Sequence, residues 1–590
     1  MNSLLPGAVA LALAVMLQAC SHATAPAQPG PAPAPGAPVI QLNQVGFLPG
    51  AAKWAAVPAG AETRFALVDA TTGREVFRGN LGPAARWEPT QDNVRLADFS
   101  ALRAPGEYRL RVDGLADSPR FAIGAQAYEA VNAASLKAFY FNRASIELKP
   151  EHAGPWARPA AHPDSRVLVH ASAAGPGRPE GTVISAPKGW YDAGDYNKYI
   201  VNSGITMYTL LAAWEHFPAY FRRQNLNIPE SGNTLPDLLD EALWNLEWML
   251  AMQDPADGGV YHKLTNKGFD GVVMPHQATS ERYVVMKTTA AALDFAAVMA
   301  QASRIFAAFD AQRPGLSARM LAASKAAWGW AQRHPAAIYK QPADIHTGGY
   351  DDDKLADEFA WAAAELYVST RDDAYLAAMK THTVKVEVPG WGSVGALGWI
   401  TLAHHREHLT PAADRALIER QINTLATRLA EQWQASPYRV AMQGIDFYWG
   451  SNANALNQAL MLIQGHRLSG ERRQLDAAQA ALDFVLGRHP TGHSMVTGFG
   501  ERSPLHPHHR PSGADGVDAP VPGFIVGGPH AVSGDDCKAP YPSKAPAKAW
   551  LDDFCSYTTN EVAINWNAPL VYVSAALQAL TPAPRPELAR

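Results

Sequence analysis

The chain has 590 residues, 47% of them hydrophobic and 18% charged, so it can bury a large core and is not a disordered protein. Lys and Arg total 50 against 55 Asp and Glu, and no basic block occurs, so a nucleic-acid partner is not expected. The three cysteines are too few for a disulfide framework. The 16 Trp residues are many for this length. Most should be core residues, but Trp side chains also line sugar-binding clefts.

The N-terminal segment has the pattern of an export signal. The apolar run at 9–17 is too short to span a membrane but fits the hydrophobic part of a signal peptide. A small residue before Cys20 resembles a bacterial lipoprotein cleavage site. Residues 1–20 are therefore expected to be a lipoprotein signal peptide with a lipidated Cys20, and 21–37 a Pro/Ala-rich tether. We expect a cell-envelope lipoprotein, with plain secretion as the alternative, and no membrane span later in the chain.

Residues 38–124 predict a small β-sandwich. Alternating apolar and polar residues at 64–68 and 105–112 indicate strands, and turns rich in Gly, Pro and Asp separate them.

From 125 to 583 the apolar spacing becomes helical. Twelve helices are predicted, at 126–141, 201–216, 234–250, 285–308, 316–334, 356–369, 374–382, 394–406, 411–435, 452–467, 472–486 and 562–580. Long loops interrupt them at 142–200, 254–284, 340–355 and 488–560. Loops of this length inside a compact domain are usually functional.

The first loop ends in two acidic residues, Asp192 and Asp195, with Gly194 between them. Their side chains can point into one small volume, where one carboxylate deprotonates a water molecule and the other orients it. A structural turn or a cation site is the alternative interpretation.

Glu561 lies at a junction between a loop and a helix, among aromatic and amide residues. A carboxyl group with apolar neighbours has a raised pKa and is a candidate proton donor. The alternative is a first-turn Glu that stabilises the helix dipole.

Three histidines cluster at 506–510, in the order His506-Pro507-His508-His509-Arg510. A metal site and a purely structural loop are both possible interpretations of this cluster. Pro507 and Arg510 favour hydrogen bonding to a substrate over a metal shell.

These segments resemble glycoside hydrolase family nine, the inverting cellulases, over about residues 38–583. Asp192-Ala193-Gly194-Asp195 is similar to the family's catalytic aspartate motif, and 496–510 to its histidine signature. The acid signature is matched by 550–552 together with Tyr557 and Glu561. Residues 38–124 resemble the immunoglobulin-like module that precedes many of these enzymes.

The resemblance implies a mainly α protein with an (α/α)6 barrel as catalytic domain at 125–583, after the immunoglobulin-like β-sandwich. It implies Asp195 as general base, Asp192 as second holder of the water and Glu561 as general acid. Asp552 and His508 join this catalytic set. The residues expected to contact sugar are Arg510, His262, Trp391, Trp449, Trp566 and Tyr557.

The activity implied is that of an inverting endo-β-1,4-glucanase. An exo-acting cellodextrinase, β-glucosidase or glucosaminidase of the same family is the alternative. Hydrogen bonds around Gly194 and Tyr196 should keep the pKa of Asp195 low, and burial near Trp566 and Tyr557 should raise that of Glu561. The expected partners are β-glucan or cello-oligosaccharide and, through the lipid anchor, a membrane. We expect a monomer.

The chemistry requires no cofactor, but two metal sites known in the family have to be considered. Many members carry a Cys-rich zinc site, whereas Arg143 and His162 stand in the corresponding segments here, so no structural zinc is expected. The acidic run at 351–358 resembles a family calcium site, with Asp352, Asp357 and Glu358 as ligands. A solvated helix start is the alternative.

Finally, Cys537 and Cys555 either pair in an oxidising envelope or remain free.

Overall fold

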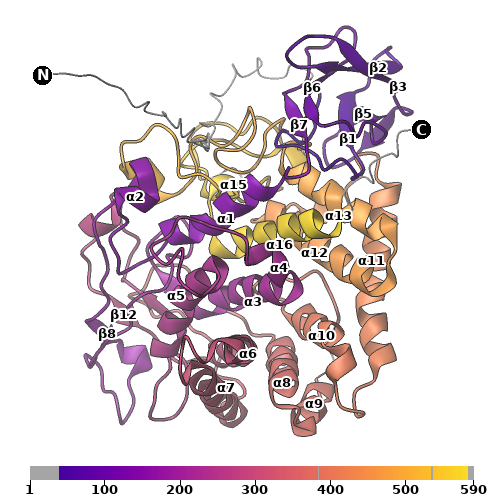
Figure 1. Ribbon diagram of the computed structural model, residues 1–590. Helices are drawn as coiled ribbons and strands as arrows, with labels where there is room; N and C mark the ends of the chain where they lie inside the picture. Colours follow the sequence, from indigo (N-terminus) through magenta and orange to yellow (C-terminus); the bar gives the residue numbers. More distant parts are fainter. Residues whose placement is uncertain (1–38, 383, 533, 535, 582–590) are drawn as a thin grey trace, which may run out of the picture.

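The computed structural model describes residues 39–581 except 383, 533 and 535. The expected signal peptide, Cys20 and the tether at 21–37 lie outside this part of the chain. A small β-sandwich sits at one end of a much larger helical domain (Figure 1).

Two antiparallel sheets form the sandwich, as the alternating pattern predicts. One has the order β1-β5-β4 and the other β3-β2-β6-β7. The strands are β1 (Trp54–Pro58), β2 (Arg64–Asp69), β3 (Glu75–Asn80), β4 (Ala85–Trp87), β5 (Asp92–Asp98), β6 (Gly106–Arg111) and β7 (Phe121–Ile123). Between the sheets, Phe47 packs edge-to-face on Phe99 and Phe121.

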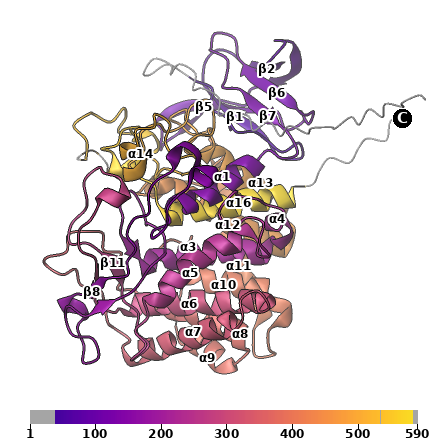
Figure 2. The ribbon, with the colours of Figure 1, turned by 60° about the vertical axis from the view of Figure 1, so that its left-hand side comes forward.

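The helical domain has two concentric layers, which confirms the (α/α)6 barrel (Figures 1 and 2). The inner helices are α3 (Ile200–His216), α6 (Thr289–Phe306), α8 (Ala356–Thr370), α10 (Gly395–His404), α12 (Ser451–Ser469) and α16 (Ile564–Leu580). The outer ones are α1 (Glu129–Phe141), α5 (Asp237–Ala251), α7 (Leu316–Arg333), α9 (Asp373–Lys380), α11 (Arg415–Ala435) and α13 (Arg472–Val485). Inner helices are buried almost all round, whereas α7 and α11 bury one face only. Each inner helix follows an outer one or precedes it, so six pairs close the ring.

Helix α6 corrects the expectation that no later segment could cross a membrane. The segment Thr289–Phe309 is long and apolar enough to do so. It is an inner helix of the barrel, however, with 78% of its most apolar window buried inside the protein. Its hydrophobicity is therefore explained by the barrel core.

The long loops carry secondary structure that periodicity did not reveal. A sheet with the order β10-β11-β12-β8-β9 is built from β8 (Val167–Val169), β9 (Val183–Ile184), β10 (Lys198–Tyr199), β11 (Lys263–Thr265) and β12 (Tyr283–Val284). Three short helices also lie in these loops, α2 (Pro150–Ala153), α14 (Arg510–Ala514) and α15 (Tyr557–Asn560), and a fourth, α4 (Pro218–Phe221), follows α3 directly. Strands of two or three residues are too short for alternation to be visible in the sequence.

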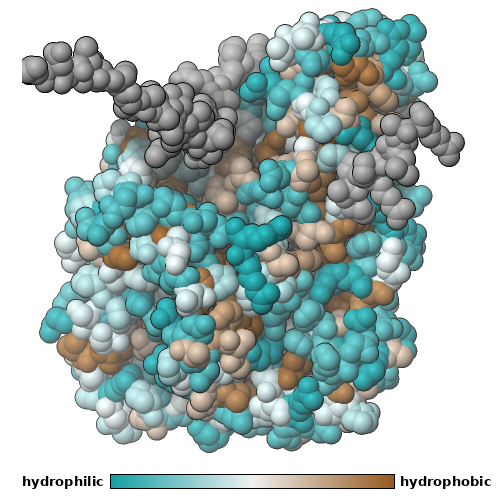
Figure 3. All heavy atoms as spheres, viewed as in Figure 1, coloured by the Kyte–Doolittle hydropathy of each residue, from teal (hydrophilic) through white to brown (hydrophobic). Residues whose placement is uncertain are grey.

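The sandwich is docked firmly against the barrel. The Trp87 ring stacks on Tyr438 with 4.6 Å between centroids and meets Phe447 and Phe484 edge-on. In addition, the buried Asn43 side chain donates to Asp483 of α13. Figure 3 shows the sandwich in contact with the barrel, whose visible face is mostly hydrophilic with scattered apolar residues.

Candidate active site

The loop between β9 and β10 brings two carboxyl groups together. Asp192 and Asp195 are 1% and 6% exposed, and the backbone between them runs directly against the histidine segment. A Cβ atom on Gly194 would lie 2.3 Å from the carbonyl oxygen of His508. Glycine is therefore needed here because the two segments approach too closely for any side chain.

Both carboxyl oxygens of Asp192 are engaged. Oδ2 accepts a hydrogen bond from the Tyr350 hydroxyl at 2.6 Å, and Oδ1 accepts one from Asn202 Nδ2 at 2.7 Å. Burial, reinforced by the charge of Asp195, raises the pKa of Asp192 to about 7. The group is thus held in place by its neighbours and is easily protonated.

Asp195 differs from Asp192 in having one unengaged oxygen. Its Oδ2 accepts hydrogen bonds from Asn197 Nδ2 at 2.5 Å and from the Tyr199 hydroxyl at 3.3 Å. Its Oδ1 has no hydrogen-bond partner among the described residues. Burial raises the pKa of Asp195, although Asn197 and the Arg510 charge oppose the shift. The expectation of a low pKa is wrong, and the hydrogen bonds come from Asn197 and Tyr199 instead of the surroundings of Gly194 and Tyr196.

Glu561 lies beside the same loop although it is 366 residues further along the chain. Its Oε1 accepts a hydrogen bond from the Gly194 backbone N–H at 3.3 Å. Burial first, and then the charge of Asp195, raise the pKa of Glu561 well above its usual value. A carboxyl group in this setting keeps its proton to a higher pH than an exposed one and can donate it.

The histidine segment forms one wall of the site. His508 lies beside Glu561 in a parallel bridge, and its Nδ1 bonds the carbonyl oxygen of Phe554 at 2.6 Å. This fixes the ring proton on Nδ1. Arg510 donates to Gly194 O at 2.8 Å and to Asp270 O at 2.9 Å, so its guanidinium is tied to the catalytic loop.

Asp552 positions this wall through hydrogen bonds to its backbone. It accepts backbone N–H bonds from Leu505 at 2.8 Å and His506 at 3.0 Å, and a side-chain bond from Asn560 at 3.0 Å. Asn560 immediately precedes Glu561. The Asp552 carboxylate therefore joins the histidine segment to the helix that presents Glu561, and the place of Asp552 in the catalytic set stays a prediction.

Three of the aromatic residues expected to contact sugar have accessible rings. Trp449 is 44% exposed and Tyr557 42%, with 5.7 Å between their ring centroids. Trp391 is half-buried and meets Tyr350 edge-on at 5.2 Å. Large exposed aromatic faces next to catalytic carboxyls are typical of carbohydrate subsites.

Two other expected sugar contacts are corrected by the structure. His262 is fully buried, stacks on Tyr339 and uses both ring nitrogens, one toward Thr288 Oγ1 and one toward Gly349 O. It therefore anchors the loop that carries Tyr350. Trp566 is 8% exposed, and its ring fills the space beside Gly450 and Gly527.

A second cluster of carboxyl groups lies at the start of α8, where calcium was expected. Asp352 and Glu358 are buried, and Asp294 of α6 joins them, a residue that the acidic run did not include. Both carboxyl oxygens of Asp294 and of Glu358, and Oδ2 of Asp352, have no hydrogen-bond partner among the described residues. Burial first, and then the charges of Asp294 and Asp357, raise the pKa of Glu358 to about 11. Unpartnered, buried oxygen ligands of this kind fit a hard cation such as Ca²⁺.

The segments that the sequence resemblance compares with a zinc site have a different chemistry here. The buried Arg143 guanidinium forms ion pairs with Glu230 and Glu241, each at 3.0 Å. His162 Nδ1 bonds the Tyr191 hydroxyl at 2.7 Å, and burial lowers its pKa to about 3. A fixed guanidinium opposes a second cation at this place, so these residues do not fit a zinc site.

Cys537 and Cys555 form a disulfide, which decides between the two alternatives left open. Asp553 lies next to it and, with the two sulfur atoms, would form a possible metal group. Because the sulfur atoms are bonded to each other, they are not thiolate ligands.

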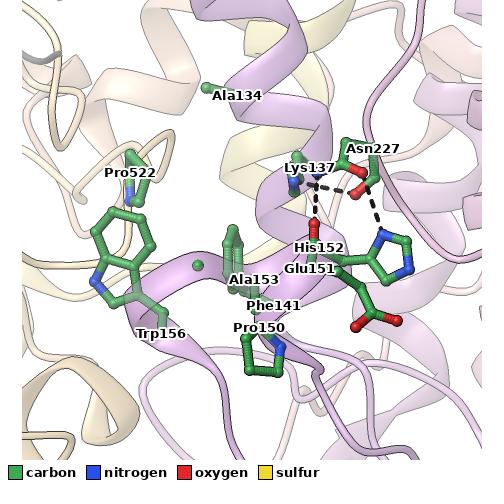
Figure 4. A pocket seen from close by; sticks show the side chains of 11 residues that line it. Ala134, Lys137, Phe141, Pro150, Glu151, His152, Ala153, Trp156, Asn227 and Pro522 are labelled. Carbon is green, nitrogen blue, oxygen red and sulfur yellow. Dashed lines mark hydrogen bonds between the residues drawn. The ribbon is translucent and has the colours of Figure 1, made fainter. Parts of the chain in front are cut away.

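One surface cavity of about 300 Å³ lies at the C-terminal end of α1, and none of the catalytic candidates lines it. Figure 4 shows Trp156 and Pro522 on one side and Lys137, His152 and Asn227 on the other. The polar groups bond one another: Lys137 donates to Asn227 O at 3.2 Å, and His152 pairs with the Asn227 side chain.

Several functional residues were not foreseen from the sequence. Tyr350, Asn202, Asn197 and Tyr199 hold the two aspartates, and Asp294 completes the acidic cluster. Asn197 and Tyr199 could have been suggested by their closeness to Asp195. The other three come from separate elements and carry no local signal.

Comparison with known proteins agrees with this geometry. Residues 128–574 match glycosyl hydrolase family 9, and residues 36–117 match the cellulase N-terminal ig-like domain. The chain belongs to glycosyl hydrolase family 9. It is therefore a glycoside hydrolase, as the resemblance implied.

Two relatives within family 9 are similar along nearly the whole chain. A xyloglucan-specific endo-beta-1,4-glucanase of Bacteroides ovatus is 43% identical, with 92% of this chain and 94% of the relative covered. Endoglucanase D of Acetivibrio thermocellus is 33% identical, with 91% and 83% covered. Among solved structures, AaCel9A in complex with cellobiose-like isofagomine has a TM-score of 0.82 at 34% identity, and the match covers 92% of this chain and all of that one.

Proposed function

We propose that this family 9 enzyme is an endo-β-1,4-glucanase that acts with inversion of configuration. The observation that carries the proposal is the asymmetry of the carboxyl groups. Asp195 keeps one oxygen unengaged, while Glu561, beside the same loop, has a strongly raised pKa. One group can therefore accept a proton from water while the other donates a proton to the leaving sugar.

In the proposed mechanism Asp195 is the general base. Its Oδ1 accepts the proton of the attacking water, and the hydrogen bonds from Asn197 and Tyr199 to Oδ2 fix the orientation of the carboxylate. Asp192, held by Tyr350 and Asn202, helps to place the same water. Glu561 protonates the glycosidic oxygen as the bond to the anomeric carbon breaks. The water attacks from the opposite face, so a β-linkage gives an α-anomeric product in one displacement.

The residues expected to contact substrate are of a kind that suits a glucan chain. Trp391, Trp449 and Tyr557 offer aromatic faces suited to the C–H face of a pyranose. His508 contacts both Tyr557 and the Glu561 backbone, and Arg510 is bonded to Gly194 between the two aspartates. The relative at 43% identity is named for xyloglucan, so xyloglucan and unsubstituted β-1,4-glucan are the two substrates to compare.

The proposal is tested on polymer and oligomer together. On carboxymethyl-cellulose and on xyloglucan, an endo-acting enzyme lowers viscosity well before reducing ends accumulate. Release of glucose or cellobiose from cellotetraose, with little loss of polymer viscosity, would instead indicate the exo-acting alternative. NMR of the fresh product decides the stereochemistry, because a β-anomer that appears first would refute inversion and the role of Asp195.

We further propose that the acidic cluster of Asp294, Asp352, Asp357 and Glu358 binds a structural calcium ion. The unpartnered buried oxygens support this. The ion would neutralise charges that otherwise repel one another. It has no part in the proton transfers, which belong to Asp195 and Glu561.

We also propose a lipid anchor at Cys20 in the cell envelope, with export of an unanchored protein as the alternative. The support is the sequence pattern alone, an apolar run followed by a small residue and Cys20. A Cys20→Ala variant expressed in a bacterial host should move from the membrane fraction to the soluble fraction. A variant that stays with the membrane would refute the anchor.

A further inference from the structure

Two large apolar side chains are exposed on the loop after β11, beside the catalytic aspartates. Phe269 is 52% exposed and Val272 is 50% exposed. Single apolar residues on a surface are common and need no explanation. These two differ because of how their loop is held and what lies next to it.

Several hydrogen bonds tie this loop to the catalytic machinery. Asn266 donates from its backbone to Asn197, the residue that holds Asp195, and from its side chain to Asp270. The Tyr196 hydroxyl donates to Val273 O at 2.5 Å. Phe269 and Val272 are thus presented from a segment fixed on the carboxyl site, so little ordering cost remains when a ligand covers them.

The two side chains also extend a row of apolar groups across the site. The Arg510 guanidinium lies 5.5 Å from the centroid of the Phe269 ring. Val272 and Phe554 both border Gly513, and Phe554 packs on His508 with 4.6 Å between ring centroids. The row then continues to Tyr557 and Trp449. We call these six residues the apolar strip: Phe269, Val272, Phe554, His508, Tyr557 and Trp449.

We propose that Phe269 and Val272 form an additional glucosyl subsite at the far end of the apolar strip from Trp449. The occupant is a β-1,4-glucan chain that passes over the carboxyl groups, and the inference rests on the proposed glucanase function. Continuity with the site is the reason for this occupant. Arg510 bonds both Gly194 of the catalytic loop and Asp270 next to Phe269, so a chain that follows this wall reaches the Phe269 ring. The C–H face of a pyranose packs on the Phe269 ring, while Arg510 donates hydrogen bonds to the hydroxyl groups of the sugar.

The subsite predicts a loss of affinity that depends on chain length. In a Glu561→Gln background, which slows hydrolysis of cello-oligosaccharides, we compare the dissociation constants of cellohexaose and cellobiose by calorimetry. Phe269→Ala should weaken cellohexaose binding about tenfold, the scale expected when one aromatic contact is lost. Cellobiose, which is too short to cover the whole strip, should bind as before. Phe269→Tyr keeps the ring and should restore the affinity. Val183→Ala, at a position 43% exposed on β9, is the matched control and should change neither constant.

The outcomes separate the subsite from the proposed function. If Phe269→Ala binds cellohexaose as tightly as its background, or weakens both ligands equally, the subsite is refuted. If the parent protein hydrolyses no glucan but the length-dependent loss is observed, the subsite stands as a binding site and the proposed function fails. A melting temperature unchanged in Phe269→Ala shows that the loop remains folded.

Discussion

Asp192 and Asp195 are three residues apart, yet their surroundings give them different chemistry. Tyr350 and Asn202 occupy both oxygens of Asp192, whereas Asp195 has an oxygen with no partner in the described part of the chain. Proton acceptance requires such an open oxygen within hydrogen-bond reach of the water. The proposed division of roles therefore rests on hydrogen-bond occupancy, which spacing in the sequence does not show.

The base and the acid should respond differently to the leaving group. Asp195→Asn should lower kcat about 10²- to 10⁴-fold on every substrate, because water activation is always required. In Glu561→Gln, kcat should fall by a similar factor on cellotetraose. It should fall far less on an aryl cellobioside with an acidic phenol, because that leaving group departs without protonation. Steady-state kinetics on both substrates test this. Equal losses in Glu561→Gln would show that Glu561 is not the proton donor.

The carboxyl groups also predict a bell-shaped dependence of kcat/KM on pH. Activity rises as Asp195 ionises and falls as Glu561 loses its proton, and because burial raises the pKa of both, both limbs lie above the ordinary range near 4. The neighbouring carboxyls titrate together, so the two apparent values belong to the group. On an aryl cellobioside, Glu561→Gln should keep the acidic limb and lose the alkaline one. An alkaline limb that persists would assign it to another residue.

At this scale the sequence suggested the candidate reacting groups, which the structure brings together, but not the residues that hold them. Motif residues such as Asp195 and Glu561 could be assigned because their chemistry depends on residue type. His262 was assigned to substrate because a histidine pattern cannot show that both ring nitrogens are already used inside the protein. Tyr350 was missed because its partner, Asp192, lies 158 residues earlier in the chain.

Among the elements, the loops bring the distant residues together while the helices supply a rigid frame. The loop that carries Tyr350 is anchored on one side by His262 and continues into Asp352 of the acidic cluster. Helix periodicity predicted all twelve barrel helices because each buries one or more faces. It could not predict the five short strands in the loops, whose pairing is set by tertiary contacts.

Calcium should stabilise the folded protein through this cluster. At a free concentration 100 times its dissociation constant, an ion that binds only the folded state adds about 2.7 kcal/mol to the free energy of unfolding. The melting temperature should therefore fall with EDTA and recover with Ca²⁺. In Asp294→Asn it should respond less, since one ligand charge is removed. A melting temperature indifferent to both reagents would contradict the site.

The disulfide should support the wall that carries His508. Cys555 follows Phe554, whose carbonyl oxygen bonds His508, and Asp536 next to Cys537 accepts hydrogen bonds from Thr558. The disulfide links residues 18 positions apart. By reducing the entropy of the unfolded chain, a link of this length adds about 3 kcal/mol to the free energy of unfolding. A Cys537→Ser/Cys555→Ser double variant should therefore melt at a lower temperature and lose activity several-fold. The parent protein treated with a reductant should behave in the same way, whereas unchanged activity in both would show that the wall holds without the disulfide.

For the whole molecule, the β-sandwich is part of the framework of the enzyme. Alternation in the sequence predicted its strands, but the docking depends on contacts between segments hundreds of residues apart, which neither periodicity nor motif spacing reports. Trp87 shows this clearly: it ends a three-residue strand, yet 4% of it is exposed because Tyr438, Phe447 and Phe484 cover it. Phe447 in turn lies two residues before Trp449, one of the exposed aromatic residues of the site.

Removal of the Trp87 side chain should therefore affect both stability and substrate binding. A buried Trp replaced by Ala typically costs about 3–5 kcal/mol, from lost burial and the cavity that remains. Because Phe447 loses its packing partner and Trp449 follows it closely, KM for cellohexaose should also rise while kcat changes little.

Arg78→Ala is the matched control, since its side chain is 63% exposed on the same sandwich and should alter stability by less than about 0.5 kcal/mol. Thermal unfolding and steady-state kinetics on both variants test the argument. If Trp87→Ala lowers the melting temperature and leaves KM unchanged, the sandwich stabilises the barrel without shaping the cleft; if neither changes, the docking contact contributes little to either.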